Sequence, residues 1–143
     1  MSVKDVITAK WLGNLAFEGS VGGHKITIDA GRSGGGEDRG ARPKSLMLLA
    51  LAGCTGIDVI SILKKMRVEV ENLNITVEGN LTEEYPKYYH SMHVIYEFTG
   101  KNLPPDKLQK AVELSEEKYC GVSAVYKKAV KMTSEIKIIE SPA

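Results

Sequence analysis

The first third of the chain alternates between apolar and polar residues in short runs that end at tight-turn signals. The runs occupy residues 7–12, 15–21 and 24–29. Gly13-Asn14 and Gly22-Gly23 stand between them, and pairs of this kind favour two-residue hairpin turns. The pattern therefore predicts three antiparallel strands in a meander. Residues 30–42, which are rich in glycine and charged side chains, are predicted to form a flexible polar loop.

A nearly continuous apolar stretch from Leu46 to Leu63 follows this loop. Pro43 stands where proline commonly opens a helix, so the stretch predicts a helix over about residues 43–66. Because it is apolar almost all round, we expect this helix to be central and covered on several sides. Asp58 and two glycines interrupt the stretch, which is also close to the lower length limit for a membrane span. A buried helix is therefore the better interpretation.

The second half of the chain repeats the plan of strands followed by helices. Residues 70–81 and 88–98 alternate like half-buried strands, and the segment between them predicts a long hairpin. Pro104-Pro105 predicts the start of a second helix that runs to about Tyr119. Its inner stripe is predicted to be Leu108, Ala111, Val112 and Ser115. A short helix over about residues 123–130 and a last strand over 132–139 complete an α+β pattern.

The composition places the chain among single-domain globular proteins. It has 143 residues, of which 43% are hydrophobic and 26% charged, and we expect one domain over residues 1–143. A net charge of +1 argues against a nucleic-acid partner bound through phosphate neutralisation. The N-terminus lacks the pattern of a signal peptide, so we expect a soluble, cytoplasmic protein with no membrane partner. In that reducing compartment a pair of cysteines is more often catalytic than structural.

The two cysteines are the strongest candidates for chemistry. Cys54 lies in the apolar stretch between Gly53 and Gly56, which thin the helix surface so that a ligand can approach. Asp58, one turn later, would raise the pKa of the thiol, so a reactive Cys54 needs an arginine to outweigh it. The glycine-rich loop offers Arg32, Arg39 and Arg42. Cys120 would then supply the partner for a sulfenic acid, and the alternative is a pair of buried, unreactive cysteines.

Other kinds of site have less support. The histidines and cysteines show neither CxxC nor HxxxH spacing, so no metal site is expected. A phosphate-binding loop is not expected either, because Gly31 to Gly36 is followed by Glu37-Asp38 instead of lysine and a hydroxyl residue. The adjacent acidic pairs Glu83-Glu84 and Glu116-Glu117 are interpreted as solvated surface.

Residues 42–59 resemble the central helix of the OsmC/Ohr family of thiol-dependent peroxidases, in a Pro-x-x-Leu-x-x-x-Ala-x-x-x-Cys pattern that ends at Cys54. Residues 118–123 are similar to the second motif of that family, Cys-Pro-Val-Ser, with Gly121 in place of the proline. The loop at residues 36–40 resembles the OsmC-like branch. Together with the order of strands and helices, the resemblance covers essentially the whole chain.

The resemblance implies an OsmC-like α+β fold, with antiparallel sheets packed around two central helices in an intertwined homodimer. Cys54 would be the peroxidatic thiol and Cys120 the resolving thiol, with no metal or other cofactor. Arg39, or else Arg32, would stabilise the thiolate. The family commonly carries a glutamate just after the proline, where this chain has Lys44 and Ser45, and Asp58 or Glu37 would take over its role.

The implied activity is the reduction of a hydroperoxide by Cys54, as part of an antioxidant stress response. Cys54 would then form a disulfide with Cys120, and an external dithiol would reduce this disulfide. The apolar neighbours Met47, Leu51 and Ile57 would bind the substrate and favour organic hydroperoxides over hydrogen peroxide. Two alternatives are a protein of the same fold that binds a small apolar or thiol ligand with weak or no peroxidase activity, and a structural dimer with inert thiols.

Overall fold

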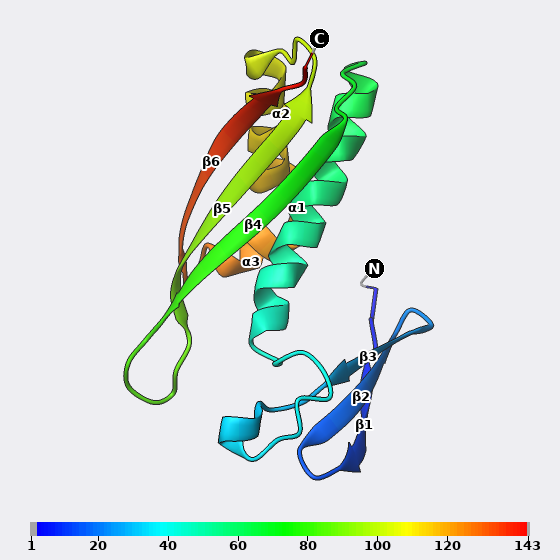
Figure 1. The fold of residues 1–143 in the computed structure, drawn as a ribbon, viewed down its shortest axis with the longest axis vertical. Helices are drawn as coiled ribbons and strands as arrows, with labels where there is room; N and C mark the ends of the chain where they lie inside the picture. The colour runs from blue at the N-terminus through cyan, green and yellow to red at the C-terminus, as the bar shows by residue number, and fades with distance from the viewer. Residues whose placement is uncertain (1–2, 143) are drawn as a thin grey trace. The chain divides into compact units, whose positions relative to one another are not determined.

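The predicted meander is confirmed in the first part of the chain. The computed structural model describes residues 3–142, which divide between residues 47 and 48 into two units. The first unit contains an antiparallel three-stranded sheet (Figure 1) of strands β1 (Thr8–Gly13), β2 (Ala16–Val21) and β3 (His24–Ile28). Both turns contain residues with positive φ, at Gly13-Asn14 and at Gly22-Gly23. Such turns match the twist of the flanking strands.

The loop that follows β3 is more ordered than the sequence suggests. The side chain of Asp29 is 2% exposed and accepts hydrogen bonds from the backbone N–H groups of Arg39 (3.1 Å), Ala30 (2.7 Å) and Glu37 (3.1 Å). These bonds, with that from Arg39 as the largest cause, lower the pKa of Asp29. A 3₁₀ turn over Arg32–Gly34 lies within the loop. Hydrogen bonds to one buried carboxylate therefore hold several residues of the predicted polar loop.

A second three-stranded sheet forms the framework of the other unit. Its strands are β4 (Asn72–Leu81), β5 (Tyr89–Gly100) and β6 (Lys131–Glu140), in the order β4-β5-β6. The predicted hairpin is confirmed, since β4 and β5 are antiparallel. The expectation of purely antiparallel sheets is wrong for β5 and β6, which are parallel. The reason is that helices connect β5 to β6. This crossover connection returns the chain to the end of the sheet where β5 begins, so β6 runs in the same direction as β5.

Three α-helices accompany this sheet. α1 (Ser45–Lys65) begins two residues later than predicted, because Pro43 and Lys44 form a turn whose carbonyls accept the N–H groups of Leu46 and Met47. α2 (Pro105–Leu114) ends earlier than predicted and continues as a π-helical turn, Ser115–Tyr119. α3 (Gly121–Tyr126) lies earlier than the predicted short helix.

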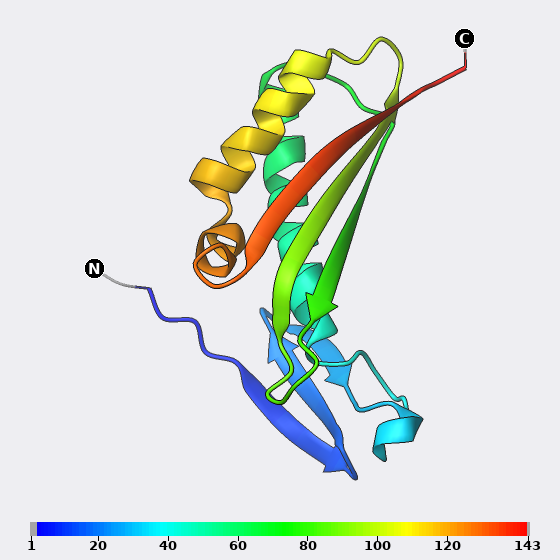
Figure 2. The same ribbon diagram turned by 90° about the vertical axis from the view of Figure 1, so that its left-hand side faces the viewer.

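The core of the second unit lies between the sheet and its helices. Figures 1 and 2 show α1 and α2 on the same face of the β4-β5-β6 sheet. Alternate residues of β5 point into this core, as expected for a strand with one buried face. The strand contributes Met92, Val94, Tyr96 and Phe98, and the helices contribute Leu51, Val59, Leu63, Leu108, Ala111 and Val112. The predicted inner stripe of α2 is buried in full, including Ser115.

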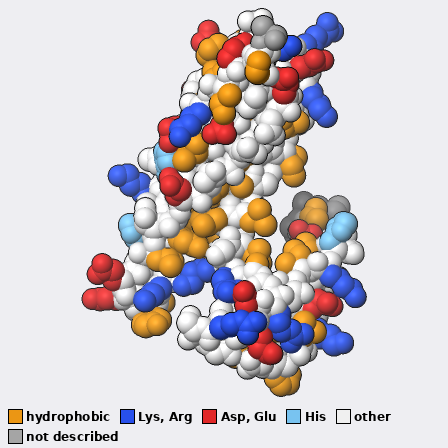
Figure 3. Space-filling model, in the orientation of Figure 1, with side chains coloured by type: hydrophobic (Ala, Val, Ile, Leu, Met, Phe, Trp, Pro, Cys, Tyr) orange, Lys and Arg blue, Asp and Glu red, His pale blue; other side chains and the backbone are white. Residues whose placement is uncertain are grey.

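The outer side of α1 differs from the expectation of a helix covered on several sides. Its buried residues are Leu51, Thr55, Val59 and Leu63, one per turn along a single stripe. Leu49 and Ile57 are 65% and 75% exposed, and Figure 3 shows hydrophobic side chains reaching the surface of this unit. By length and composition α1 would also suit a membrane span, but its inner stripe packs on the sheet like that of a core helix. Within this unit the outer side of α1 therefore carries exposed apolar side chains.

Candidate functional site

The fold brings together the two cysteines that the sequence singles out. Cys54 lies at the middle of α1, and Cys120 lies between the π-helical turn and α3. The sulfur atoms of both residues and a carboxylate oxygen of Asp58 all lie within 4.8 Å of one another. Cys54 and Asp58 are four residues apart on α1 and therefore share a face of the helix. The two thiols are free and do not form a disulfide.

Ser115 links the two segments that carry the thiols. Its hydroxyl donates to Asp58 Oδ2 at 3.0 Å, and its carbonyl oxygen accepts the N–H of Cys120 at 2.7 Å. The second bond spans five residues, as in a π-helix, and π-helical turns often lie at functional sites. Asp58 therefore does more than lie close to the thiols: it anchors the turn that places Cys120 against α1.

The environments of the two thiols differ. Cys54 is partly exposed, whereas Cys120 is only 2% exposed. Burial, followed by its hydrogen bond to Cys54, raises the pKa of Cys120 above its usual range. The N–H of Ser123 donates to Cys120 Sγ at 3.3 Å and acts in the opposite direction without overcoming burial. Cys54 is therefore the thiol that is more accessible to a substrate. Cys120 is the more buried thiol, and its raised pKa favours the protonated form.

Glu116 corrects the interpretation of the Glu116-Glu117 pair as solvated surface. Its carboxylate accepts hydrogen bonds from the hydroxyls of Tyr96 (2.7 Å) and Ser134 (3.2 Å). Tyr96 is fully buried, and burial, followed by its hydrogen bond to Glu116, raises the pKa of its hydroxyl. Glu116 therefore fastens the π-helical turn to β5 and β6. The sequence holds no signal for this role beyond an acidic residue next to the inner stripe of α2.

The arginines proposed as activating residues belong to the first unit. The Arg39 side chain donates to the carbonyl of Leu12 at 3.4 Å, and Arg42 pairs with Asp38 at 2.8 Å. Arg32 begins the 3₁₀ turn of the loop. Their approach to Cys54 remains a prediction.

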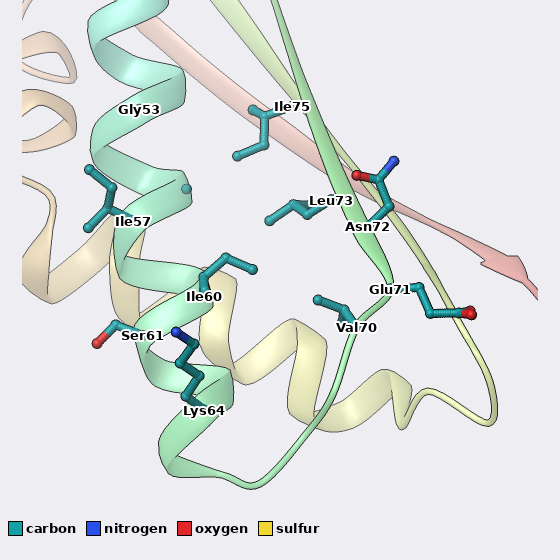
Figure 4. A pocket seen from close by; sticks show the side chains of 11 residues that line it. Gly53, Ile57, Ile60, Ser61, Lys64, Val70, Glu71, Asn72, Leu73 and Ile75 are labelled. Atoms are coloured by element: carbon teal, nitrogen blue, oxygen red, sulfur yellow. The ribbon is translucent and has the colours of Figure 1, made fainter.

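An apolar groove of about 740 Å³ lies between α1 and β4 (Figure 4). Gly53 and Gly56 form part of its α1 wall. Gly56 allows a close approach, because a Cβ there would lie 2.9 Å from the end of the Ile75 side chain. The other lining residues are Ile57, Ile60, Ser61, Lys64, Val70, Glu71, Asn72, Leu73 and Ile75.

The three residues predicted to bind substrate occupy different surroundings. Ile57 lines the groove, whereas Leu51 is 1% exposed and belongs to the core. Met47 is partly exposed at the start of α1 and falls in the first unit. The three therefore do not form one surface within the second unit.

Comparisons with known proteins agree with this architecture. The family model described as OsmC-like protein matches residues 34–135. Protein YhfA of Escherichia coli strain K12 is 36% identical over 131 residues, which cover 91% of this chain and 95% of YhfA. The crystal structure of a hypothetical protein from Aquifex aeolicus VF5 is 30% identical with a TM-score of 0.86, and the match covers 99% of this chain and 100% of that one.

A structure with lower sequence identity has the same fold. The organic hydroperoxide resistance protein OhrB of Bacillus subtilis is 20% identical with a TM-score of 0.66, over 94% of this chain and 98% of that one. At that identity the match shows a shared fold. From the family match and the identity to YhfA, this chain belongs to the OsmC family.

Proposed function

We propose that this protein is a thiol-dependent peroxidase that reduces organic hydroperoxides with Cys54 and Cys120. The observation that carries the proposal is the position of the two sulfur atoms, which come from distant parts of the sequence and lie within 4.8 Å of each other. A sulfenic acid on the more accessible Cys54 would have a second thiol within easy reach. Relatives of this fold include proteins named for organic hydroperoxide resistance, which agrees with the proposed substrate class.

The proposed cycle has three balanced steps. The Cys54 thiol and a hydroperoxide give a Cys54 sulfenic acid and an alcohol, as sulfur attacks one peroxide oxygen and the O–O bond breaks. The Cys120 thiol then attacks the sulfenic sulfur, so that a disulfide forms and water leaves. An external dithiol exchanges with this disulfide and restores both thiols. No metal or other cofactor enters these steps.

The apolar groove between α1 and β4 has room for the alkyl portion of a substrate. Gly53, the neighbour of Cys54, lines this groove together with Ile57 and Leu73. An alkyl chain would bury apolar surface there, whereas hydrogen peroxide has none to bury. Arg39, with Arg32 as the second choice, is proposed to stabilise the Cys54 thiolate. We further propose that the protein is a cytoplasmic homodimer, because its chemistry needs reduced thiols and the outer side of α1 is apolar.

The first test is the intact mass and free-thiol count of the reduced protein before and after one equivalent of cumene hydroperoxide. The expected result is the loss of two hydrogen atoms and of both thiols within seconds. Cys54→Ser is expected to consume no peroxide. Cys120→Ser is expected to reduce one equivalent and to stop at the Cys54 sulfenic acid, which a further equivalent of peroxide then overoxidises. Full activity in Cys54→Ser would overturn the mechanism.

The groove also favours a second candidate function, the binding of a small apolar ligand without turnover. Lys44 and Ser45 stand where the family commonly carries a glutamate, and a weakened reaction would leave the groove as a binding site. Unchanged mass and two surviving thiols after peroxide treatment would favour this function. If neither thiol of the native protein can be alkylated, a structural dimer with inert thiols is favoured instead.

A further inference from the structure

The side chains around Cys54 form a ligand set that proteins use for soft divalent cations. Two sulfur atoms and one carboxylate oxygen, from Cys54, Cys120 and Asp58, lie within 4.8 Å of one another. Four-coordinate zinc has Zn–S distances of about 2.3 Å and Zn–O distances of about 2.1 Å, which spaces its ligand atoms roughly 3.5 to 3.8 Å apart. Small side-chain rotations would therefore close the three atoms around one ion.

Hydrogen bonds from outside this trio already hold two of the three ligands. The N–H of Ser123 donates to Cys120 Sγ at 3.3 Å, and the hydroxyl of Ser115 donates to Asp58 Oδ2 at 3.0 Å. Bonds of this kind orient the ligands of metal sites and support the charge on thiolate and carboxylate groups. CxxC and HxxxH spacing cannot reveal this arrangement, because its ligands come from α1 and from the turn before α3.

We propose that the reduced protein binds one Zn²⁺ ion through Cys54, Cys120 and Asp58, with water at the fourth position. Binding replaces the proton of each thiol, so two protons leave for each ion bound. A disulfide offers no thiolate, so oxidation and zinc binding exclude each other. A metal-bound Cys54 would also be unable to attack a peroxide, so zinc inhibits the reaction. The inhibition rests on the proposed peroxidase function, whereas the binding does not.

Cobalt is the probe that tests the binding, because Co²⁺ takes the place of Zn²⁺ in such sites and is coloured. The reduced full-length chain would be titrated with Co²⁺ without oxygen. The expected result is one ion per chain, with strong visible bands of a tetrahedral site and sulfur-to-cobalt charge transfer in the near ultraviolet. Zn²⁺ is expected to displace the cobalt. Protein oxidised with diamide is expected to show neither signal.

Substitutions identify the ligands. Cys54→Ser and Cys120→Ser are each expected to weaken Zn²⁺ binding at least ~10-fold and to reduce the charge-transfer band. Asp58→Asn is expected to weaken binding ~10-fold with the charge-transfer band retained. Asp106→Asn, at an exposed position in the first turn of α2, is the matched control and is expected to leave the affinity unchanged. Should Cys120→Ser fail to fold, wild-type protein alkylated with iodoacetamide replaces it.

The outcomes for zinc and for peroxide are separable, because the cobalt titration contains no peroxide. The metal site would be overturned if cobalt bound without a charge-transfer band. Equal affinity of Cys54→Ser and Asp106→Asn for cobalt would also overturn it. If the protein binds no cobalt but loses both thiols on treatment with peroxide, the metal site is overturned and the proposed peroxidase function is retained. For the inhibition, zinc-saturated protein is expected to consume cumene hydroperoxide more slowly than zinc-free protein, with recovery on adding a chelator. Unchanged consumption would overturn the inhibition.

Discussion

At the level of single residues, the hydroxyl of Ser115 connects the helix that carries Cys54 to the turn that precedes Cys120. It is fully buried and donates to Asp58 at 3.0 Å. Ser115→Ala would leave the carboxylate without this donor, so we expect a loss of about 1–3 kcal/mol in the free energy of unfolding. Disulfide closure is expected to slow more than sulfenic acid formation. Urea unfolding and quenched-flow mass spectrometry measure the two effects.

The control for this prediction is Ser61→Ala. Ser61 is exposed on the same helix, so its replacement is expected to change the stability by less than about 0.5 kcal/mol. Equal effects of the two substitutions on stability and on closure would contradict a linking role for Ser115.

The pKa of Cys120 sets a second expectation at this scale. Burial, followed by its hydrogen bond to Cys54, raises that pKa, so at neutral pH most molecules carry the protonated thiol. Because the thiolate is the attacking form, the rate of disulfide closure should rise about tenfold per pH unit as long as the pH stays below the raised pKa. Stopped-flow measurements from about pH 6 to pH 9 test this. A plateau that begins near or below the ordinary thiol pKa of about 8.5 would contradict it.

At the level of elements, most of the strands and helices were predictable from apolar periodicity and turn residues. The meander, the β4-β5 hairpin and the inner stripe of α2 depend on local patterns, which the sequence displays directly. The π-helical turn at residues 115–119 was not predictable, because its residues suit an ordinary helix equally well. Its geometry depends on Tyr96 and Ser134, which are distant in sequence and bind Glu116. The residues alone left the pairing of Cys54 with Cys120 open against two inert thiols, and the family resemblance favoured the pairing.

The loop after β3 provides a prediction about an element. A Cβ on Gly40 would collide with the backbone carbonyl of Thr27, whereas a Cβ on Gly34 would meet no atom within 4 Å. Gly40→Ala is therefore expected to destabilise the first unit by about 1–3 kcal/mol. Gly34→Ala is expected to be neutral or slightly stabilising, because it only restricts the unfolded chain. Trp11 on β1, the one tryptophan of the chain, reports unfolding of this unit by fluorescence. Similar unfolding curves for the two variants would contradict the steric argument.

At the level of the whole molecule, the exposed apolar side chains on the outer side of α1 suggest an interface with another protein surface. Leu49 and Ile57 are exposed in the single chain, although the apolar pattern of the helix predicts burial. We propose that a second copy of the chain supplies that cover, as the resemblance to the OsmC/Ohr family implies. Light scattering after size exclusion is therefore expected to give twice the 15.6 kDa mass of the chain.

Substitution on this face tests the same expectation. Ile57 is 75% exposed, so Ile57→Lys leaves the core of the single chain intact while it places a charge in the proposed interface. Burying one isoleucine is worth about 1.5–3 kcal/mol, and a two-fold interface counts it twice. Ile57→Lys should therefore raise the dissociation constant of the dimer roughly 100-fold or more. Gln109→Lys, on the exposed side of α2, adds the same charge and should leave the mass unchanged. A single-chain mass for the unsubstituted protein, or equal behaviour of the two lysine variants, would contradict dimerisation through α1.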